Sequence, residues 1–88
     1  MDEDPTLARL RAEIAAVDDE IVRAVNRRLE LVREIRAHKE RIAIPFVDRG
    51  REDSNLRRLE EANDGPLSTP GLRELYARLL ELTKRETE

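Results

Sequence analysis

The sequence predicts an all-α protein with three helices, a long N-terminal one followed by two shorter ones. The chain of 88 residues is 42% charged and 39% hydrophobic, with one Tyr, one Phe and no Trp, which is typical of helical bundles and coiled coils. Its apolar residues recur at alternating spacings of three and four between Leu7 and Ile35, as they do along one face of a helix. A β-sheet needs more β-branched and aromatic residues than this chain contains.

The first helix is expected over about residues 5–41. Asp4 is a favourable N-cap, Pro5 fits the first helical turn, and neither Gly nor a further Pro occurs before Pro45. At about 1.5 Å per residue such a helix is roughly 50 Å long, whereas a compact chain of this size is only about 30 Å across. We therefore predict a homodimer in which the two long helices pack together.

A second helix is expected over about residues 49–63, after a short apolar linker that is broken by Pro45. Asp48 stands where an N-cap is needed. The apolar residues of the segment fall on one helical face, and they are Leu56, Leu59 and Ala62. The sequence Asn63-Asp64-Gly65-Pro66 then predicts a helix end and a turn.

A third helix is expected over about residues 70–86. Ser68 or Thr69 followed by Pro70 is a typical helix start. The apolar stripe of this segment consists of Leu72, Leu75 or Tyr76, Leu79 and Thr83. The Thr83 hydroxyl is expected to bond back to its own helix. Because the chain has no internal repeats, we expect one helical domain over residues 1–88.

Composition excludes several classes of function. The formal net charge of -3 argues against a binder of nucleic acid, so that any cationic site has to be local. The chain has no Cys and a single His, His38, which leaves neither a disulfide framework nor a His or Cys metal cluster. No stretch is apolar enough to span a membrane, and the acidic N-terminus lacks the pattern of a signal peptide. We therefore expect a cytoplasmic protein.

Three cations lie on or beside the apolar face of the long helix, where Leu or Ile would be expected. Arg28 follows Ile21 by seven residues and Lys39 follows Ile35 by four, and a buried cation is costly unless an anion meets it. Their separation of eleven residues corresponds to about 20° of rotation and roughly 16 Å of rise, which leaves a gap for one small anion. Arg11 lies too far along the axis to join them, but an antiparallel partner helix would bring it there.

A simpler interpretation stands beside this one. Cations on a helix face often lay their stems on apolar surface and keep the charge in water. On the second helix Glu52 faces the core, but it also complements the helix dipole, while Asp48 is a cap and Arg51 is solvated in the simpler interpretation. The charged run at residues 33–36 is expected to be a solvated face.

The order of these residues carries a family resemblance. The patterns LxRLRxEIxxVDxEI, NRRLELVxEI, HK and PxxDxxRE follow one another along the chain. Each is degenerate, but in this order and spacing they closely resemble the all-α intracellular class of chorismate mutases. The resemblance extends from Leu7 to about Thr83.

The resemblance implies an intertwined all-helical homodimer with two equivalent active sites. Each site would convert chorismate to prephenate, a [3,3] Claisen rearrangement in the biosynthesis of Phe and Tyr that needs no cofactor and no covalent intermediate. The protein then has two tasks. It holds a flexible dianion in its reactive chair, and it places positive charge where the transition state is more negative than the ground state.

The resemblance also implies a role for each of the three cations. Arg28 would hold one carboxylate of the substrate, and Arg11, donated by the other subunit, would hold the carboxylate at the opposite end. Lys39 would bind a carboxylate and the ether oxygen that gains charge as the C–O bond breaks. Arginine suits bidentate clamping of a carboxylate, and lysine suits a point charge beside one oxygen.

The remaining site residues implied by the resemblance lie on the two shorter helices. Arg51 would add positive potential, and the backbone of Asp48 together with Glu52 would take the substrate hydroxyl. Thr83 falls where the family often has Ser. Thr87 falls where many members place a Gln against the ether oxygen, and a threonine is too short to reach as Gln does.

Three alternatives remain open at this point. The same scaffold and similar cations suit an isochorismate pyruvate lyase. A weakly active or non-catalytic regulatory module that partners a DAHP synthase of the shikimate pathway is compatible with the altered C-terminus. A dimeric coiled-coil adaptor would use the helices alone and would bind no dicarboxylate.

Overall fold

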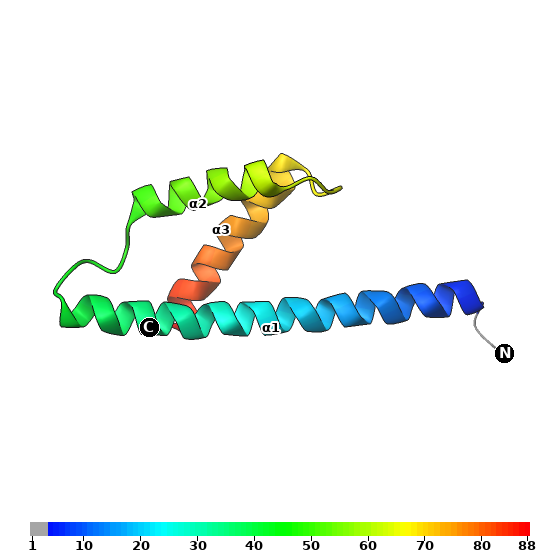
Figure 1. Ribbon diagram of the computed structural model, residues 1–88, viewed down its shortest axis with the longest axis horizontal. Coiled ribbons are helices and arrows are strands. Elements are labelled where there is room, and N and C mark those ends of the chain that lie inside the picture. The colour runs from blue at the N-terminus through cyan, green and yellow to red at the C-terminus, as the bar shows by residue number, and fades with distance from the viewer. Residues whose placement is uncertain (1–3) are drawn as a thin grey trace. The chain divides into compact units, whose positions relative to one another are not determined.

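Residues 4–88 are described by a computed structural model, in which they form three α-helices and no strand (Figure 1). Helix α1 runs Pro5–Arg41, α2 runs Arg49–Ala62 and α3 runs Thr69–Glu86. The predicted all-α fold with three helices is confirmed. The bounds of α2 and α3 differ from the expected ones by a single residue, since Asn63 caps the end of α2 and α3 begins one residue before Pro70.

Side-chain caps set where the helices begin. The Asp4 carboxylate accepts a hydrogen bond from the backbone N–H of Leu7 at 2.9 Å, and the Ser68 hydroxyl accepts one from Gly71 at 3.0 Å. Each cap satisfies a backbone donor that has no partner within the first helical turn. Two of the three predicted helix starts therefore have the expected physical cause, and the third, at Asp48, belongs to the candidate site.

The C-terminal end of α1 is closed by a left-handed residue. Ala43 has a φ of 59°, its N–H donates to the carbonyl of Glu40 at 3.3 Å, and the N–H of Ile44 donates to the carbonyl of Lys39 at 3.0 Å. This pair of bonds is the Schellman motif, which usually has Gly at the left-handed position. The turn reverses the chain directly after α1 ends at Arg41 and starts the linker that leads to α2.

The chain divides into two units that are described separately. The first, which ends at Leu31, contains the N-terminal part of α1. Its apolar seam is open, because Ile14, Val17 and Ile21 are each 51–61% exposed. Over its whole length Pro5–Arg41, α1 has no buried residue.

The second unit, Val32–Glu88, holds the buried residues. Helix α3 packs on α2 and buries Leu72, Tyr76 and Thr83. The apolar stripe predicted from the sequence contained either Leu75 or Tyr76. In the structure Tyr76 is buried, whereas Leu75 is 57% exposed. The two residues differ by about 100° around the helix axis, so only one of them faces α2.

Polar contacts fasten the elements of the second unit to one another. Arg73 donates from Nε to Glu60 at 2.8 Å and so joins α3 to α2. This hydrogen bond lowers the pKa of Glu60, so the contact is present at neutral pH and is lost as the pH falls through that lowered pKa. Arg33 on α1 donates to the backbone carbonyl of Glu86 at 3.1 Å and holds the last turn of α3.

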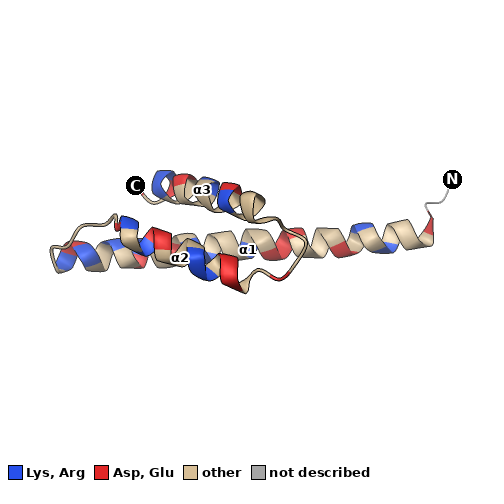
Figure 2. Ribbon diagram, turned by 90° about the horizontal axis from the view of Figure 1, so that it is seen from above, with Lys and Arg blue, Asp and Glu red and all other residues tan. Residues whose placement is uncertain are grey.

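Charged residues of both signs are interspersed along the three helices (Figure 2). This distribution fits the small net charge of -3. Within residues 4–88, none of the helices combines the length and the apolar character that crossing a membrane requires.

The left-handed Ala43 gives a test of the turn after α1. We expect Ala43→Gly to raise the free energy of unfolding by about 0.5–1 kcal/mol, because glycine adopts a positive φ without a steric penalty. Urea denaturation at a fixed protein concentration measures the change. Ala37→Gly, within α1, is the matched control and should lower stability by about 1 kcal/mol. A fall in stability for both variants would contradict the turn described here.

Candidate active site

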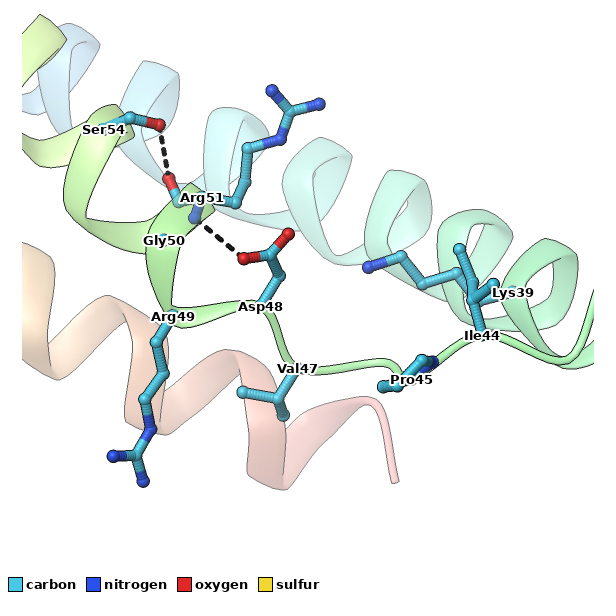
Figure 3. Close-up of a pocket in the computed structure, with 9 residues that line it drawn as sticks. All are labelled: Lys39, Ile44, Pro45, Val47, Asp48, Arg49, Gly50, Arg51 and Ser54. Atoms are coloured by element: carbon cyan, nitrogen blue, oxygen red, sulfur yellow. Dashed lines mark hydrogen bonds between the residues drawn. The ribbon is translucent and has the colours of Figure 1, made fainter.

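A pocket of about 800 Å³ lies where the linker enters α2 (Figure 3). It is lined from α1, from the linker and from the first turns of α2. Its lining residues are Lys39, Ile44, Pro45, Val47, Asp48, Arg49, Gly50, Arg51 and Ser54. The sequence therefore places three of its predicted site residues, Lys39, Asp48 and Arg51, around one cavity.

Lys39 is half-buried and reaches into this pocket from the last turns of α1. Its ammonium donates to the backbone carbonyl of Phe46 at 3.0 Å, and in Figure 3 it points toward the start of α2, where Asp48 lies. A carbonyl is a neutral acceptor, so the ammonium keeps its full positive charge and two further N–H donors. This arrangement suits an anionic oxygen that enters the pocket.

Asp48 begins α2 and shapes the other wall of the pocket. Its carboxylate accepts from the backbone N–H of Arg51 at 3.1 Å, and its carbonyl accepts from the N–H of Glu52 at 3.1 Å. The predicted N-cap is confirmed. Ser54 donates to the Arg51 carbonyl at 3.1 Å, and the Arg51 side chain is exposed, whereas Arg49 extends away from the other residues of the pocket (Figure 3).

The linker is held by a contact that the sequence did not predict. The guanidinium carbon of Arg36 lies 4.0 Å from the centroid of the Phe46 ring, and the Lys39 ammonium lies 5.9 Å from the same centroid. Within the described residues, Nε of Arg36 is buried without a hydrogen-bond partner. The expectation that residues 33–36 form a solvated face is therefore wrong for Arg36, because the returning linker covers it.

Glu52 is half-buried and faces α3. Its carboxylate lies 3.6 Å from the ammonium of Lys84, and the side chains are 27% and 47% exposed respectively. This ion pair joins α2 to α3 at the residue to which the resemblance assigns the substrate hydroxyl. Lys84 thus brings a cation next to the candidate site that the sequence did not single out.

The C-terminal end of α3 is closed by a ladder of threonine hydroxyls. Thr83 donates to the Leu79 carbonyl at 2.6 Å, as expected, and Thr87 donates to the Thr83 carbonyl at 2.6 Å. Both threonines are buried, with 5% and 4% of their surface exposed. The Thr87 hydroxyl proton is therefore already donated within α3. A Gln side chain at the same position would not need to make this bond.

Arg11 and Arg28 belong to the first unit, on the N-terminal part of α1. Arg28 is half-buried and Arg11 is exposed. Their grouping with Lys39 around one ligand stays a prediction. Among residues 4–88, no three His, Asp or Glu side chains gather in a way that would hold a metal ion.

Comparison with known proteins identifies the family. The model of chorismate mutase type II matches residues 10–88, which is nearly the whole of the described chain. The chain belongs to the chorismate mutase type II family. No curated protein matches it. Membership supports chorismate mutase activity in general terms, and it agrees with the all-helical fold.

Sequence reasoning missed three contacts around the candidate site, those of Arg36, Lys84 and Arg33. A signal existed for the first, since Phe46 is the single Phe of the chain and follows Pro45 in the linker. An isolated aromatic residue so close to several cations is a ready partner for one of them. For Lys84 and Arg33 no sequence signal existed, since their partners lie on other helices or on the backbone.

The cap at the pocket gives a second test. We expect Asp48→Ala to lower the free energy of unfolding by about 1 kcal/mol, because the N–H of Arg51 loses its acceptor. Asp48→Asn keeps an acceptor oxygen and should stay within a few tenths of a kcal/mol of the parent. Urea denaturation measures both variants, and equal losses in the two would show that the cap is not what Asp48 contributes.

Proposed function

We propose that this protein is a chorismate mutase that converts chorismate to prephenate in the pathway to Phe and Tyr. The observation that best supports the proposal is the meeting of Lys39, Asp48 and Arg51 around one pocket, in a chain of the chorismate mutase type II family. The family resemblance assigns a contact with the substrate to Lys39 and Asp48 and added positive potential to Arg51.

The chemistry needs little from the protein beyond shape and charge. In the [3,3] rearrangement the ether C–O bond breaks while a new C–C bond forms, and no proton changes place. The substrate carries two carboxylates, and the breaking C–O bond adds negative charge to the ether oxygen. Cations fixed in advance around such a dianion stabilise the transition state more than the ground state.

Lys39 has the central role in this proposal. Its ammonium is held at the pocket by the backbone carbonyl of Phe46, and one of its two further N–H donors meets an anionic oxygen of the entering substrate. A hydrogen bond with a charged partner is stronger than one with a neutral partner. The added charged hydrogen bond therefore favours the bound substrate, and Lys39 is then beside the ether oxygen as the C–O bond lengthens.

Glu52 and Thr87 have unequal roles in this proposal. Glu52 accepts the substrate hydroxyl, and its ion pair with Lys84 keeps the carboxylate in place on α2. Thr87 already donates to the Thr83 carbonyl, so its hydroxyl is not assigned to the ether oxygen. Stabilisation of that oxygen falls to Lys39.

The proposed active protein is a homodimer formed through α1. The large apolar residues of its seam that are exposed in the single chain include Leu10, Ile14, Val17 and Ile21. Burial of such a stripe against a second copy stabilises association by about 25 cal/mol per Å² of apolar surface. An antiparallel arrangement would bring Arg11 of one protomer to the site that contains Arg28 and Lys39 of its partner.

Turnover by single variants tests the assignment of the cations. We expect the purified protein to form prephenate from chorismate. Lys39→Ala and Arg28→Ala should each lower kcat/KM on the order of 10²-fold or more, because each removes charge that the transition state uses. Steady-state kinetics followed by loss of chorismate absorbance measures the effect.

Arg27→Ala is the matched control for Arg28→Ala. Arg27 is the neighbouring residue, 63% exposed, and lies 3.4 Å from Glu30 in an ion pair of the same helix. Its removal should leave kcat/KM within about twofold of the parent, since surface ion pairs contribute little. Parent-like turnover in Lys39→Ala or Arg28→Ala would refute the site. Release of pyruvate from isochorismate, with no turnover of chorismate, would favour the lyase.

Mixing two inactive variants tests the shared site. In a two-fold dimer that takes Arg11 from one protomer and Arg28 from the other, a heterodimer of Arg11→Ala with Arg28→Ala has one intact site. Its second site lacks both cations. Random exchange makes about half of the dimers heterodimers, so roughly a quarter of the parent activity should return. The measurement is prephenate formation after the variants are unfolded together and refolded.

Native mass spectrometry of the same mixture provides the control. The two variants have equal masses, so one of them is labelled with a heavy isotope before mixing. Heterodimers then have a mass between those of the two homodimers. Heterodimers without any regained activity would refute the donation of Arg11 across the dimer. A monomer in sedimentation equilibrium at the assay concentration would refute the dimer itself.

A further inference from the structure

We propose that Arg36 and Phe46 are positioning residues that set where the Lys39 ammonium lies in the pocket. The effect on catalysis rests on the proposed chorismate mutase function, whereas the effect on Lys39 itself does not. Neither Arg36 nor Phe46 lines the pocket. Both act on Lys39 through the linker between α1 and α2.

The argument starts from the acceptor of Lys39. The ammonium donates to the backbone carbonyl of Phe46 at 3.0 Å, so the place of that carbonyl decides where the positive charge sits. A backbone carbonyl in a linker is only as fixed as the linker itself. What fixes Phe46 therefore fixes Lys39.

The side chain of Phe46 is fixed by a cation on α1. Its ring lies 4.0 Å from the guanidinium carbon of Arg36, well inside the range of a cation–π contact. Arg36 precedes Lys39 by three residues, so both side chains leave the same face of α1. One residue of the linker is thus bound twice, by its ring to Arg36 and by its carbonyl to Lys39.

The buried Nε of Arg36 gives the ring contact a further role. Nε of Arg36 is buried without a hydrogen-bond partner among the described residues, and an unpaired buried donor costs free energy. The face of an aromatic ring offsets part of this cost, because its negative potential attracts the guanidinium charge. The Lys39 ammonium, 5.9 Å from the ring centroid, lies at the edge of the same attraction.

The linker is also built to return Phe46 to α1. The left-handed Ala43 reverses the chain after the helix, and Pro45 fixes its own φ and restricts Ile44 before it. These constraints leave few conformations between Lys39 and Phe46. The ring contact with Arg36 then selects the one in which the carbonyl meets the ammonium.

Three substitutions separate this role from simple packing. Phe46→Leu keeps an apolar side chain without the ring, Phe46→Tyr keeps the ring, and Arg36→Met keeps the stem without the charge. Because every variant retains the backbone carbonyl of residue 46, no variant removes the acceptor of Lys39. Arg78→Ala is the control for loss of an arginine, since Arg78 is 74% exposed and pairs with Glu81 on the same helix.

Kinetics with chorismate give the first readout. We expect Phe46→Leu and Arg36→Met to lower kcat/KM by roughly 10- to 100-fold, as displacement of a catalytic group by about 1 Å does. Phe46→Tyr and Arg78→Ala should stay within about twofold of the parent. When Lys39 is already replaced by Ala, adding Phe46→Leu should lower kcat/KM by less than about twofold, because effects that act through one residue are not additive.

Nuclear magnetic resonance gives a second readout that needs no activity. The Cε and Hε signals of Lys39 are assigned by their loss in Lys39→Ala. They should shift in Phe46→Leu and in Arg36→Met and stay in place in Phe46→Tyr. The δ-methylene protons of Arg36 should lose their ring-current shift in Phe46→Leu alone. Thermal unfolding of each variant shows whether it is folded. If Phe46→Leu does not fold, the Lys39 signals of Arg36→Met provide the test instead.

The outcomes separate this proposal from the proposed function. A parent protein that does not turn over chorismate refutes the function, and the Lys39 signals then decide on the positioning role alone. If Phe46→Leu lowers kcat/KM by the same factor with and without Lys39, the ring acts independently of the ammonium, and the proposal is overturned. Unchanged Lys39 signals in folded Phe46→Leu would overturn it as well.

Discussion

The apolar face of α1 carries many of the large hydrophobic residues of this chain, yet none of the residues Pro5–Arg41 is buried within it. Among residues 4–88, the buried hydrophobic residues are Leu72 and Tyr76, both on α3. A core of this size supplies little of the free energy that must offset the conformational entropy of folding. In the proposed function, stability and catalysis share one requirement, since the apolar stripe that is exposed in the single chain also contains Arg28 and Lys39. On the proposed dimer, assembly removes water from these cations, and in that drier surrounding they act more strongly on an anionic ligand.

The helices were predictable because their starts have local causes. Asp4, Asp48 and Ser68 each cap a helix through the bond that their residue type favours, and a cap is determined by about four neighbouring residues. The choice between Leu75 and Tyr76 was not predictable in the same way. Both fit a helical stripe, and the packing direction of α3 on α2 decides which is buried. Periodicity defines a face only to within about one residue.

Some residues of the candidate site were predictable from the sequence and others were not, and the difference has a physical reason. Lys39 was found because a cation interrupts an apolar spacing, and Asp48 because a cap was needed there. The Arg36–Phe46 contact depends on the path of the linker, which turns at a left-handed Ala43. Alanine gives no sign of that conformation, since Gly is the usual residue at a positive φ. The ion pair of Glu52 was hidden for a related reason, because its partner lies on another helix.

The end of α3 explains why the placement of Lys39 matters so much in the proposed mechanism. Thr87 is buried and donates its proton to the Thr83 carbonyl, and the neighbouring carbonyl of Glu86 accepts from Arg33. The hydroxyl of Thr87 and the carbonyl of Glu86 are thus both engaged, and by the family resemblance Thr87 falls where many members have a Gln. A transition state that gains charge on a single oxygen then depends on a single ammonium beside it. An ammonium on four flexible carbons loses entropy when it is fixed, so advance fixation through the Phe46 carbonyl is most valuable where no second donor shares the task.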